Sequence, residues 1–257
     1  MRIAHAAAVL AAVFATAALA GHGSGHLVTE TRPLRDFTGV EVAVPFDAVV
    51  REGRDFQVKI RVDQELVSLV KTEVKDNTLH VRFEGRGHDV DGDSRVEITL
   101  PDLRAVAMAG SGDLSVTASR RKDMSIASAG SGDLSYTGPA AHLRIGTSGS
   151  GDVSVHLDGD ADDVEIGTKG SGDIVVRGGG HARELVAAVA GSGNVNTEEL
   201  TARDGKLATS GSGEIECRLQ GGHASFAVAG SGGITWHGSA NVDQQARAGS
   251  GEIHHED

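Results

Sequence analysis

The triplet Gly-Ser-Gly recurs at an almost constant interval from residue 110 onward. It occurs eight times there, and successive copies are separated by 20, 19, 21, 21, 20, 19 and 19 residues. The first glycines of these copies are Gly110, Gly130, Gly149, Gly170, Gly191, Gly211, Gly230 and Gly249. A fixed period of this length is the signature of an architecture in which similar units stack on one another. The period constrains the fold more than any other feature of the sequence.

Apolar residues alternate with small or polar residues on both sides of each triplet. Around Gly130, for example, Ile126 lies four residues before the first glycine, and Leu134 and Tyr136 lie four and six residues after it. This period of two is typical of strands. A helix is excluded, because glycine at this density costs about 1 kcal/mol per residue relative to alanine. Each repeat is therefore predicted to contain two short strands joined by a glycine-rich corner.

One repeat cannot bury its apolar residues alone, but stacked coils about 4.8 Å apart form a continuous core. Because parallel crossover connections are almost always right-handed, the chain is predicted to be all-β, a right-handed parallel β-helix (β-solenoid) of about eight ~20-residue coils. A β-propeller is excluded, since each blade needs about 40 residues. The last coil has Gln245, Arg247 and His255 at inward positions, which predicts a polar C-terminal cap.

Both glycines of every triplet are predicted to be structural, because glycine adopts the positive φ angles that a tight corner demands. No nucleotide-binding loop is predicted, since Gly-x-x-x-x-Gly-Lys-Ser/Thr does not occur in the sequence. The corner glycines are Gly110, Gly112, Gly130, Gly132, Gly149, Gly151, Gly170, Gly172, Gly191, Gly193, Gly211, Gly213, Gly230, Gly232, Gly249 and Gly251.

Residues 1–20 have the features of a secretory signal peptide. Arg2 precedes the apolar stretch Ala6–Leu19, and the small residues Ala18 and Ala20 flank Leu19 at the cleavage site. The stretch is short for a membrane-spanning helix, which needs about 20 residues, so no membrane insertion is expected after cleavage. The mature chain is predicted to be exported, and to be periplasmic, cell-surface or extracellular.

The mature chain is predicted to have three parts. Residues 21–34 are expected to be a flexible N-terminus, residues 35–103 a β-rich N-terminal part of the solenoid, and residues 104–257 the repeat β-helix with its polar cap. In the second part, alternating apolar residues predict strands near residues 40–44, 56–62, 79–83 and 96–100. One short helix is expected after Asp63, with Leu66, Val67, Leu69 and Val70 on one face.

The charge and cysteine content exclude some classes of partner and bond. The formal net charge is −12, and residues 1–20 contain one arginine and no acid, so the mature chain has −12 − 1 = −13. This charge argues against nucleic acids and anionic membranes as partners. Cys217 is the single cysteine, so no internal disulfide is possible, and an inert buried thiol is expected at its inward position.

An aspartate follows each of the first four triplets: Asp113, Asp133, Asp152 and Asp173. Their backbones are expected to stack about 4.8 Å apart. Two roles remain open. The carboxylates can accept hydrogen bonds from backbone N–H groups at the corner, or the column can collect a hard cation such as Ca²⁺. Asn194 and Gly233 continue the position without charge, so the fold does not require a ligand at every coil. No other cofactor is predicted.

The unit Ala109-Gly110-Ser111-Gly112-Asp113 resembles the repeat of the head GIN domain family, labelled putative auto-transporter adhesin. The stretches Phe37–Val40, Phe46–Val49 and Val96–Leu103 are also similar to the N-terminal part of that family. The resemblance covers roughly residues 35–253. It implies an exported β-helical protein whose activity is largely unknown.

Two functions are considered. The first is an exported, non-catalytic scaffold or adhesin-like binding protein that presents flat β-helix faces to a protein or glycan partner in the envelope or outside the cell. The alternative is a carbohydrate-active β-helix enzyme, a polysaccharide lyase or hydrolase. Glycoside hydrolysis needs two carboxylates in unlike environments, whereas a stacked column gives its aspartates similar environments. Uniform coils also lack a cleft-forming insertion. Binding is therefore expected, and no catalytic residue is predicted.

Overall fold

The computed structural model describes residues 26–85, 90 and 92–256. The predicted signal peptide, residues 1–20, and the first residues of the predicted flexible N-terminus lie outside the described residues. The described chain is nearly all β, and its one helical element is a 3₁₀ turn. No helix in these described ranges is long and apolar enough to cross a membrane.

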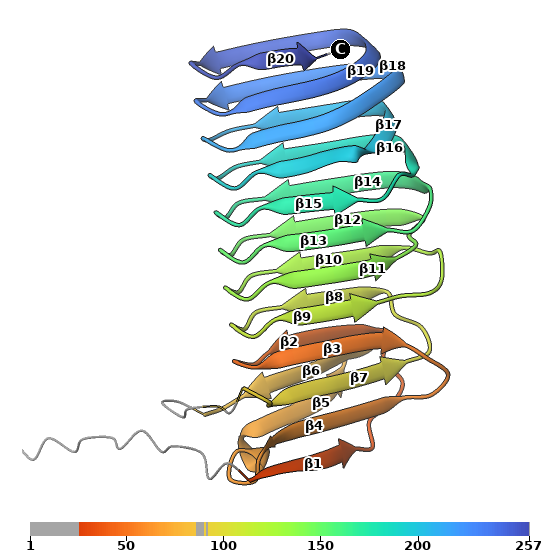
Figure 1. The fold of residues 1–257 in the computed structure, drawn as a ribbon, viewed down its shortest axis with the longest axis vertical. Helices are drawn as coiled ribbons and strands as arrows, with labels where there is room; N and C mark the ends of the chain where they lie inside the picture. The colour runs from red at the N-terminus through yellow and green to blue at the C-terminus, as the bar shows by residue number, and fades with distance from the viewer. Residues whose placement is uncertain (1–25, 86–89, 91, 257) are drawn as a thin grey trace, which may run out of the picture.

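Figure 1 shows the strands stacked along one long axis. The elements are β1 (Leu27–Arg32), β2 (Gly39–Ala43), β3 (Asp47–Glu52), β4 (Gln57–Asp63), η1 (Val67–Leu69), β5 (Val70–Lys75), β6 (Thr78–Phe83), β7 (Arg95–Leu100), β8 (Ala105–Met108), β9 (Leu114–Thr117), β10 (Met124–Ser128), β11 (Leu134–Gly138), β12 (His142–Thr147), β13 (Val153–Leu157), β14 (Ala161–Thr168), β15 (Ile174–Arg177), β16 (His181–Val189), β17 (Val195–Thr209), β18 (Glu214–Gly230), β19 (Gly233–Gly249) and β20 (Ile253–Glu256).

From β8 onward the chain winds into a parallel β-solenoid of about eight coils, as predicted. Each coil contributes one strand to each of two rows, and the Gly-Ser-Gly corner joins them along the left edge of Figure 1. Row A, before the corners, contains β8, β10, β12, β14, β16 and the later parts of β17, β18 and β19. Row B, after the corners, contains β9, β11, β13, β15, the earlier parts of β17, β18 and β19, and β20.

The inward positions form the core that the alternating pattern predicts. Ile126 pairs in register with Val106 on one side and with Ile145 on the other, and all three side chains are buried. Leu134 and Tyr136 are buried in row B in the same way. Complete burial of an aliphatic side chain of this size contributes about 1.5–3 kcal/mol. The stacked rows therefore hold the coils together along the whole solenoid.

The C-terminal coil ends in exposed polar side chains. Gln245 and Arg247, which would face inward in an internal coil, are exposed. The ring of His255 stacks on Trp236, with the ring centroids 3.8 Å apart and the planes at 10°. His255 thereby covers the last large apolar side chain of the core.

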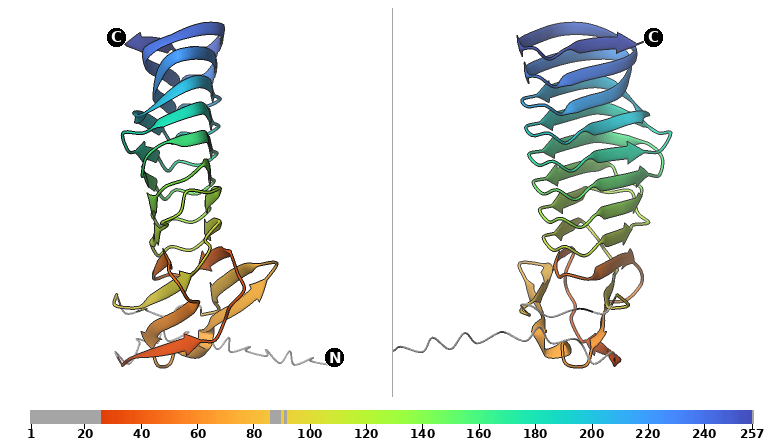
Figure 2. Two further views of the ribbon diagram at one scale, coloured as in Figure 1. Left: turned by 90° about the vertical axis from the view of Figure 1, so that its right-hand side faces the viewer. Right: turned by 60° about the vertical axis from the view of Figure 1, so that its left-hand side comes forward.

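At the other end, the order of stacking differs from the order of the chain. The coil formed by β2 and β3 lies between β8–β9 on one side and β6–β7 on the other, all in parallel. The chain therefore runs from β3 away from the solenoid, forms β4 to β7, and returns past β2–β3 to begin β8. The strand β4 is antiparallel to both β1 and β7, and β5 is antiparallel to β6. These antiparallel strands make the base of the molecule in both views of Figure 2.

Two expectations for this end are corrected by the structure. The short helix after Asp63 is wrong: only the 3₁₀ turn Val67–Leu69 forms, and Val70 already begins β5. Part of the N-terminus expected to be flexible, Leu27–Arg32, forms β1 and pairs with β4. Both strands are rich in Val and Thr, whose β-branched side chains favour extended backbone and strand pairing.

Candidate functional site

The four predicted aspartates form a hydrogen-bonded column at the start of row B. The carboxylate of Asp113 accepts the main-chain N–H of Asp133 at 2.9 Å, and the carboxylate of Asp133 accepts that of Asp152 at 2.9 Å. Asp152 in turn accepts the main-chain N–H of Asp173 at 2.8 Å. Each side chain therefore joins its own coil to the next one.

The column continues beyond the four predicted residues in both directions. Asp47 accepts the main-chain N–H of Asp113 at 3.2 Å, and Asp173 accepts that of Asn194 at 2.8 Å. The side-chain oxygen of Asn194 accepts the main-chain N–H of Glu214 at 3.0 Å. We call Asp47, Asp113, Asp133, Asp152, Asp173 and Asn194 the aspartate ladder. Asp47 was missed because no Gly-Ser-Gly precedes it; the available signal was its position at the start of an alternating strand segment.

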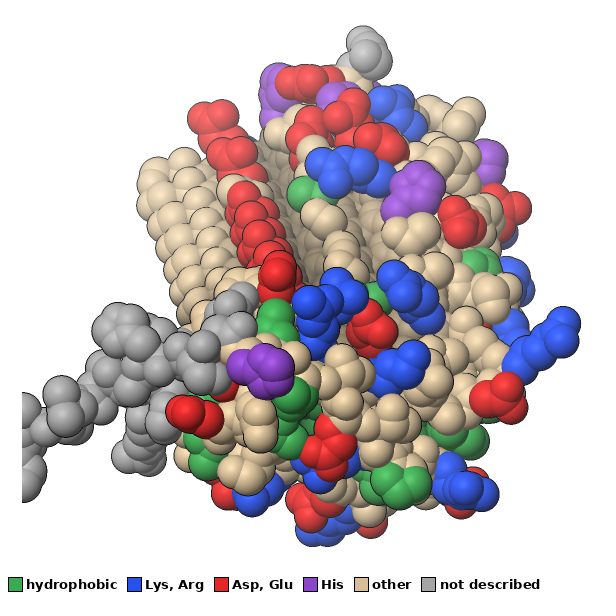
Figure 3. All heavy atoms as spheres, turned by 60° about the horizontal axis from the view of Figure 1, so that its bottom comes forward, with side chains coloured by type: hydrophobic (Ala, Val, Ile, Leu, Met, Phe, Trp, Pro, Cys, Tyr) green, Lys and Arg blue, Asp and Glu red, His purple; other side chains and the backbone are tan. Residues whose placement is uncertain are grey.

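The ladder is a surface feature. Asp113, Asp133 and Asp152 are exposed, and Figure 3 shows acidic side chains in a line along the solenoid. Neighbouring unit charges about 4.8 Å apart repel by roughly 3.5 kcal/mol at an effective dielectric of 20. The donated N–H groups offset part of this repulsion. In each of these aspartates Oδ1 accepts the bond, which leaves Oδ2 to face solvent or a cation.

The corner glycines are required for a reason other than the predicted one. A Cβ atom on Gly130 would lie 1.9 Å from the carbonyl oxygen of Gly110, and one on Gly149 would lie 2.0 Å from that of Gly130. Only Gly230 and Gly249 among the corner glycines have positive φ, at 134° and 116°. The expectation of positive φ is therefore wrong for the other corners. Glycine is needed because the corners of successive coils touch through their backbones.

One column on the outer surface of row A is made of very small residues. One outward position of this row is alanine or glycine in every coil, and the residues pair in register. We call this column the alanine face: Ala107, Ala127, Gly146, Gly167, Ala188, Ala208, Ala227 and Ala246. A shallow, mainly apolar hollow lies over its middle, where Ala129 and Ala190 also line it. Sequence reasoning predicted flat faces but did not identify this column, although it could be read three residues before each triplet.

Charged side chains border the alanine face on the side away from the corners. Arg144 pairs with Glu165 at 2.7 Å, and Lys206 pairs with Glu184 at 2.7 Å. Each pair joins neighbouring coils and is largely exposed, so it contributes little to stability. The border gives the apolar strip a polar margin.

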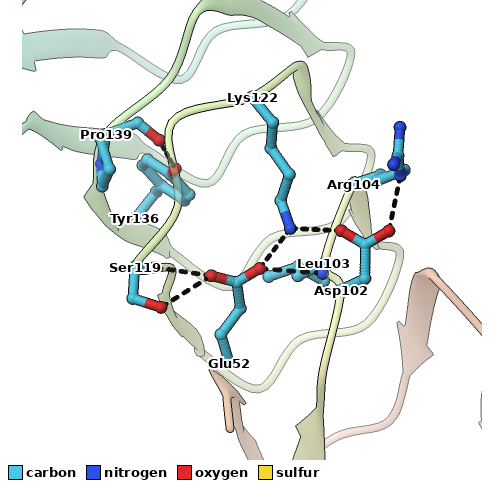
Figure 4. Close-up of polar contacts among 8 residues, drawn as sticks. All are labelled: Glu52, Asp102, Leu103, Arg104, Ser119, Lys122, Tyr136 and Pro139. Carbon is cyan, nitrogen blue, oxygen red and sulfur yellow. Dashed lines mark hydrogen bonds and ion pairs between the residues drawn. The ribbon is translucent and has the colours of Figure 1, made fainter. Parts of the chain in front are cut away.

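A buried polar network lies where the chain returns from the N-terminal strands (Figure 4). The side chain of Glu52 at the end of β3 is only 2% exposed. It accepts the main-chain N–H groups of Ser119 at 2.7 Å and Leu103 at 3.1 Å, and it pairs with Lys122. Lys122 also contacts Asp102 at 2.5 Å. The network thus joins β3 to two connections, β7–β8 and β9–β10.

The charged state of this network follows from its hydrogen bonds. Burial alone raises the pKa of Glu52, but the hydrogen bonds from Lys122, Ser119 and Leu103 outweigh it and hold the pKa below its ordinary value. The pKa of Asp102 is also lowered, first by Lys122 and then by Arg104. Both acids are therefore ionised at neutral pH. The arrangement is that of a structural network that holds β3 and the two connections together.

Cys217, Tyr136 and Trp236 lie inside the coil. Burial and the neighbouring Glu216 raise the pKa of the Cys217 thiol to about 12, so it is not a thiolate at neutral pH. The Tyr136 hydroxyl donates to the Pro139 carbonyl at 3.0 Å, and burial raises its pKa. Trp236 is 6% exposed. None of these three side chains is presented on an outer face.

Solved structures share this fold. A putative adhesin from Parabacteroides distasonis is 24% identical, with a TM-score of 0.81 over 91% of this chain and 99% of that chain. A putative adhesin from Parabacteroides merdae is 20% identical, with a TM-score of 0.83 over 92% and 99% of the two chains. A protein named as a putative lipid binding protein, from Parabacteroides distasonis, is 21% identical, with a TM-score of 0.77 over 92% and 99%. At these identities the likeness shows the fold alone.

No match to the chain is found among curated proteins. The sequence profile of one family, however, matches residues 36–240, which include the ladder, the corners of the first seven triplets and most of the alanine face. That match covers most of the chain and agrees with the resemblance of the repeat unit. The chain belongs to the family described as putative auto-transporter adhesin, head GIN domain.

Proposed function

We propose that the protein is exported and acts as an adhesin-like binding scaffold, and that its alanine face docks a protein partner in the envelope or outside the cell. The observation that carries the proposal is the in-register column of alanine and glycine across all eight coils. Eight coils about 4.8 Å apart make a strip of roughly 35 Å. Because no long side chain of the column rises above the strip, a flat partner surface can contact the sheet closely.

The surface chemistry favours a protein over a glycan. Sugar rings are commonly bound against exposed aromatic rings, and Tyr136 and Trp236 are both buried in the coil. An apolar strip with a charged margin instead has the composition of a protein interface, whose centre is apolar and whose rim is polar. The mature charge of −13 disfavours an acidic partner.

The carbohydrate-active alternative gains no support from the aspartate ladder. Asp113, Asp133 and Asp152 each accept a main-chain N–H at 2.8–2.9 Å from the equivalent residue of the next coil. Their environments are therefore alike, whereas an acid/base pair needs environments that move the two pKa values apart. The family match agrees with a binding role.

The binding proposal is tested with charge placed on the alanine face. The double variant Ala127→Glu with Ala188→Glu should bind the envelope fraction of the source organism at least tenfold more weakly than wild type, measured by biolayer interferometry. Ser115→Glu with Ser154→Glu adds the same charge to exposed positions of row B and is the matched control. Equal binding by both double variants contradicts the proposal. Loss of binding after periodate treatment of the envelope fraction identifies a glycan partner instead.

Export and the absence of catalysis are tested separately. N-terminal sequencing of the chain secreted by the source organism should begin at Gly21. The purified chain should not turn over common polysaccharides. Turnover that disappears in Asp133→Asn or Asp152→Asn contradicts the binding role and favours the enzyme.

A further inference from the structure

Row B carries a compact group of one imidazole and two carboxylates near the C-terminal end. Among the described residues, Glu198, Glu216 and His237 each place one ligand atom within 4.8 Å of the others. They belong to three consecutive coils: Glu198 lies within β17, Glu216 within β18 and His237 within β19. We call these three residues the His237 cluster. It is separate from the alanine face, which belongs to row A.

The ring of His237 lies between two carboxylates. Its side chain is 11% exposed, its Nε2 atom is 3.3 Å from an oxygen of Glu216, and its Nδ1 atom is 3.8 Å from an oxygen of Glu256. A neutral imidazole has one N–H group, so it can donate toward only one of these carboxylates. The other ring nitrogen then directs its lone pair at a carboxylate oxygen. A metal ion bound to a ring nitrogen removes that repulsion.

Asn196 holds the carboxylate of Glu216 and the main chain of Glu198. Its side-chain amide donates to Oε2 of Glu216 at 2.7 Å, which leaves Oε1 facing His237. Its side-chain oxygen accepts the main-chain N–H of Glu198 at 3.1 Å. Outer partners of this kind hold metal ligands in position in known sites. The competing cation is Arg218, whose guanidinium lies 3.3 Å from Glu198.

We propose that Glu198, Glu216 and His237 bind a divalent transition metal ion, and that zinc is the metal that fits best. Nitrogen and oxygen ligands at about 2.0–2.2 Å suit Zn²⁺, and four-coordinate ligands then lie about 3.3 Å apart. His237 Nε2 and Glu216 Oε1 are already 3.3 Å apart, and the other ligand atoms, within 4.8 Å, must close by at most about 1.5 Å, which rotation of the two half-buried glutamates allows. Three protein ligands leave a fourth position for water. Ca²⁺ fits less well, because it prefers oxygen ligands throughout.

The test is calorimetric titration of the purified, tag-free chain with ZnCl₂, together with its thermal midpoint with and without zinc. Wild type should bind one Zn²⁺ per chain and unfold at a higher temperature when zinc is present. Glu216→Gln and His237→Gln should each weaken binding at least tenfold. His156→Gln is the matched control: His156 has the same place in its coil and a single carboxylate partner, Asp158, at 3.6 Å. It should bind zinc as wild type does.

Absence of zinc binding by wild type contradicts the proposal, and so does unchanged affinity in both Glu216→Gln and His237→Gln. Because His237 is buried, circular dichroism must show that His237→Gln is folded; if it is not, the half-buried Glu216→Gln decides the result. Binding that is lost in His254→Gln but kept in both cluster variants would place zinc at the C-terminal histidines and overturn the assignment. The outcome is independent of the alanine face.

Discussion

The carboxylate of Asp113 accepts the main-chain N–H of Asp133, the equivalent residue of the next coil, at 2.9 Å. A side chain thereby supplements the main-chain bonds of the parallel sheet that joins β9 to β11. Asn194 makes the same bond to Glu214 with an uncharged oxygen. An acceptor oxygen, and not a negative charge, is therefore what the ladder requires.

Removal of one ladder oxygen should destabilise the solenoid more than removal of its charge. Asp133→Ala leaves the main-chain N–H of Asp152 without its acceptor and should lower the free energy of unfolding by about 1 kcal/mol. Asp133→Asn keeps an acceptor oxygen and should change the free energy of unfolding by less than about 0.5 kcal/mol. Urea denaturation measures both. Equal losses in the two variants would mean that the charge is the stabilising feature.

The hydrogen-bonding role of the ladder predicts little dependence on calcium. A bound ion would stabilise the folded state by mass action and raise the thermal midpoint. Because the hydrogen-bonding role needs no ion, addition of millimolar Ca²⁺ after treatment with EDTA should change the midpoint by less than about 1 °C. Differential scanning calorimetry gives the midpoint. A large loss of stability in EDTA that Ca²⁺ restores would instead make Asp113, Asp133, Asp152 and Asp173 a metal site.

The buried Glu52 network should make the protein sensitive to acid. The pKa of Glu52 is lower in the folded chain than its ordinary value of 4.5, so its contribution to stability is present above that pH and is lost as the pH falls through the folded pKa. Glu52→Gln should destabilise the protein at pH 7 by about 2 kcal/mol, because Lys122 and the main-chain N–H groups of Leu103 and Ser119 lose a charged acceptor while Lys122 keeps Asp102. Thermal midpoints measured from pH 7 to pH 3 should therefore converge for the two proteins.

A matched acid on the surface provides the control for that experiment. Glu165 pairs with Arg144 on the outer surface of row A. Glu165→Gln should therefore give a curve of thermal midpoint against pH that is parallel to that of wild type. If the curves of wild type and Glu52→Gln are also parallel down to pH 3, the network does not link stability to pH.

Most of the fold could be predicted because the residues of each repeat identify its own strands and inward positions. Alternation around each triplet identifies the inward residues, and Ile126, Ile145 and Leu134 are buried as predicted. The interruption of the inward row at the C-terminal end is equally local: Gln245 and Arg247 break the apolar alternation, and both are exposed. The positions of the four aspartates also follow from the triplets alone, although their hydrogen bonds run between coils.

The order of stacking and the Glu52 network were missed because they depend on contacts between distant residues. The pairing of β2 with β8 joins Val40 to Val106, and no period in residues 35–103 indicates that order. Glu52 meets Lys122 across 70 residues for the same reason. The helix expected after Asp63 was wrong because pairing of β5 with β6 begins at Val70. The glycine requirement was identified correctly but explained wrongly, since the contact is between coils.

Backbone contact between stacked corners determines this solenoid, and one pair of glycine variants tests this relationship most directly. Gly130→Ala places a Cβ atom 1.9 Å from the carbonyl oxygen of Gly110, whereas a Cβ atom on Gly146 meets nothing within 4 Å. By thermal and urea unfolding, Gly130→Ala should lose more than about 4 kcal/mol of stability or fail to fold, and Gly146→Ala should change it by less than about 1 kcal/mol. Similar stability of the two variants would contradict the account.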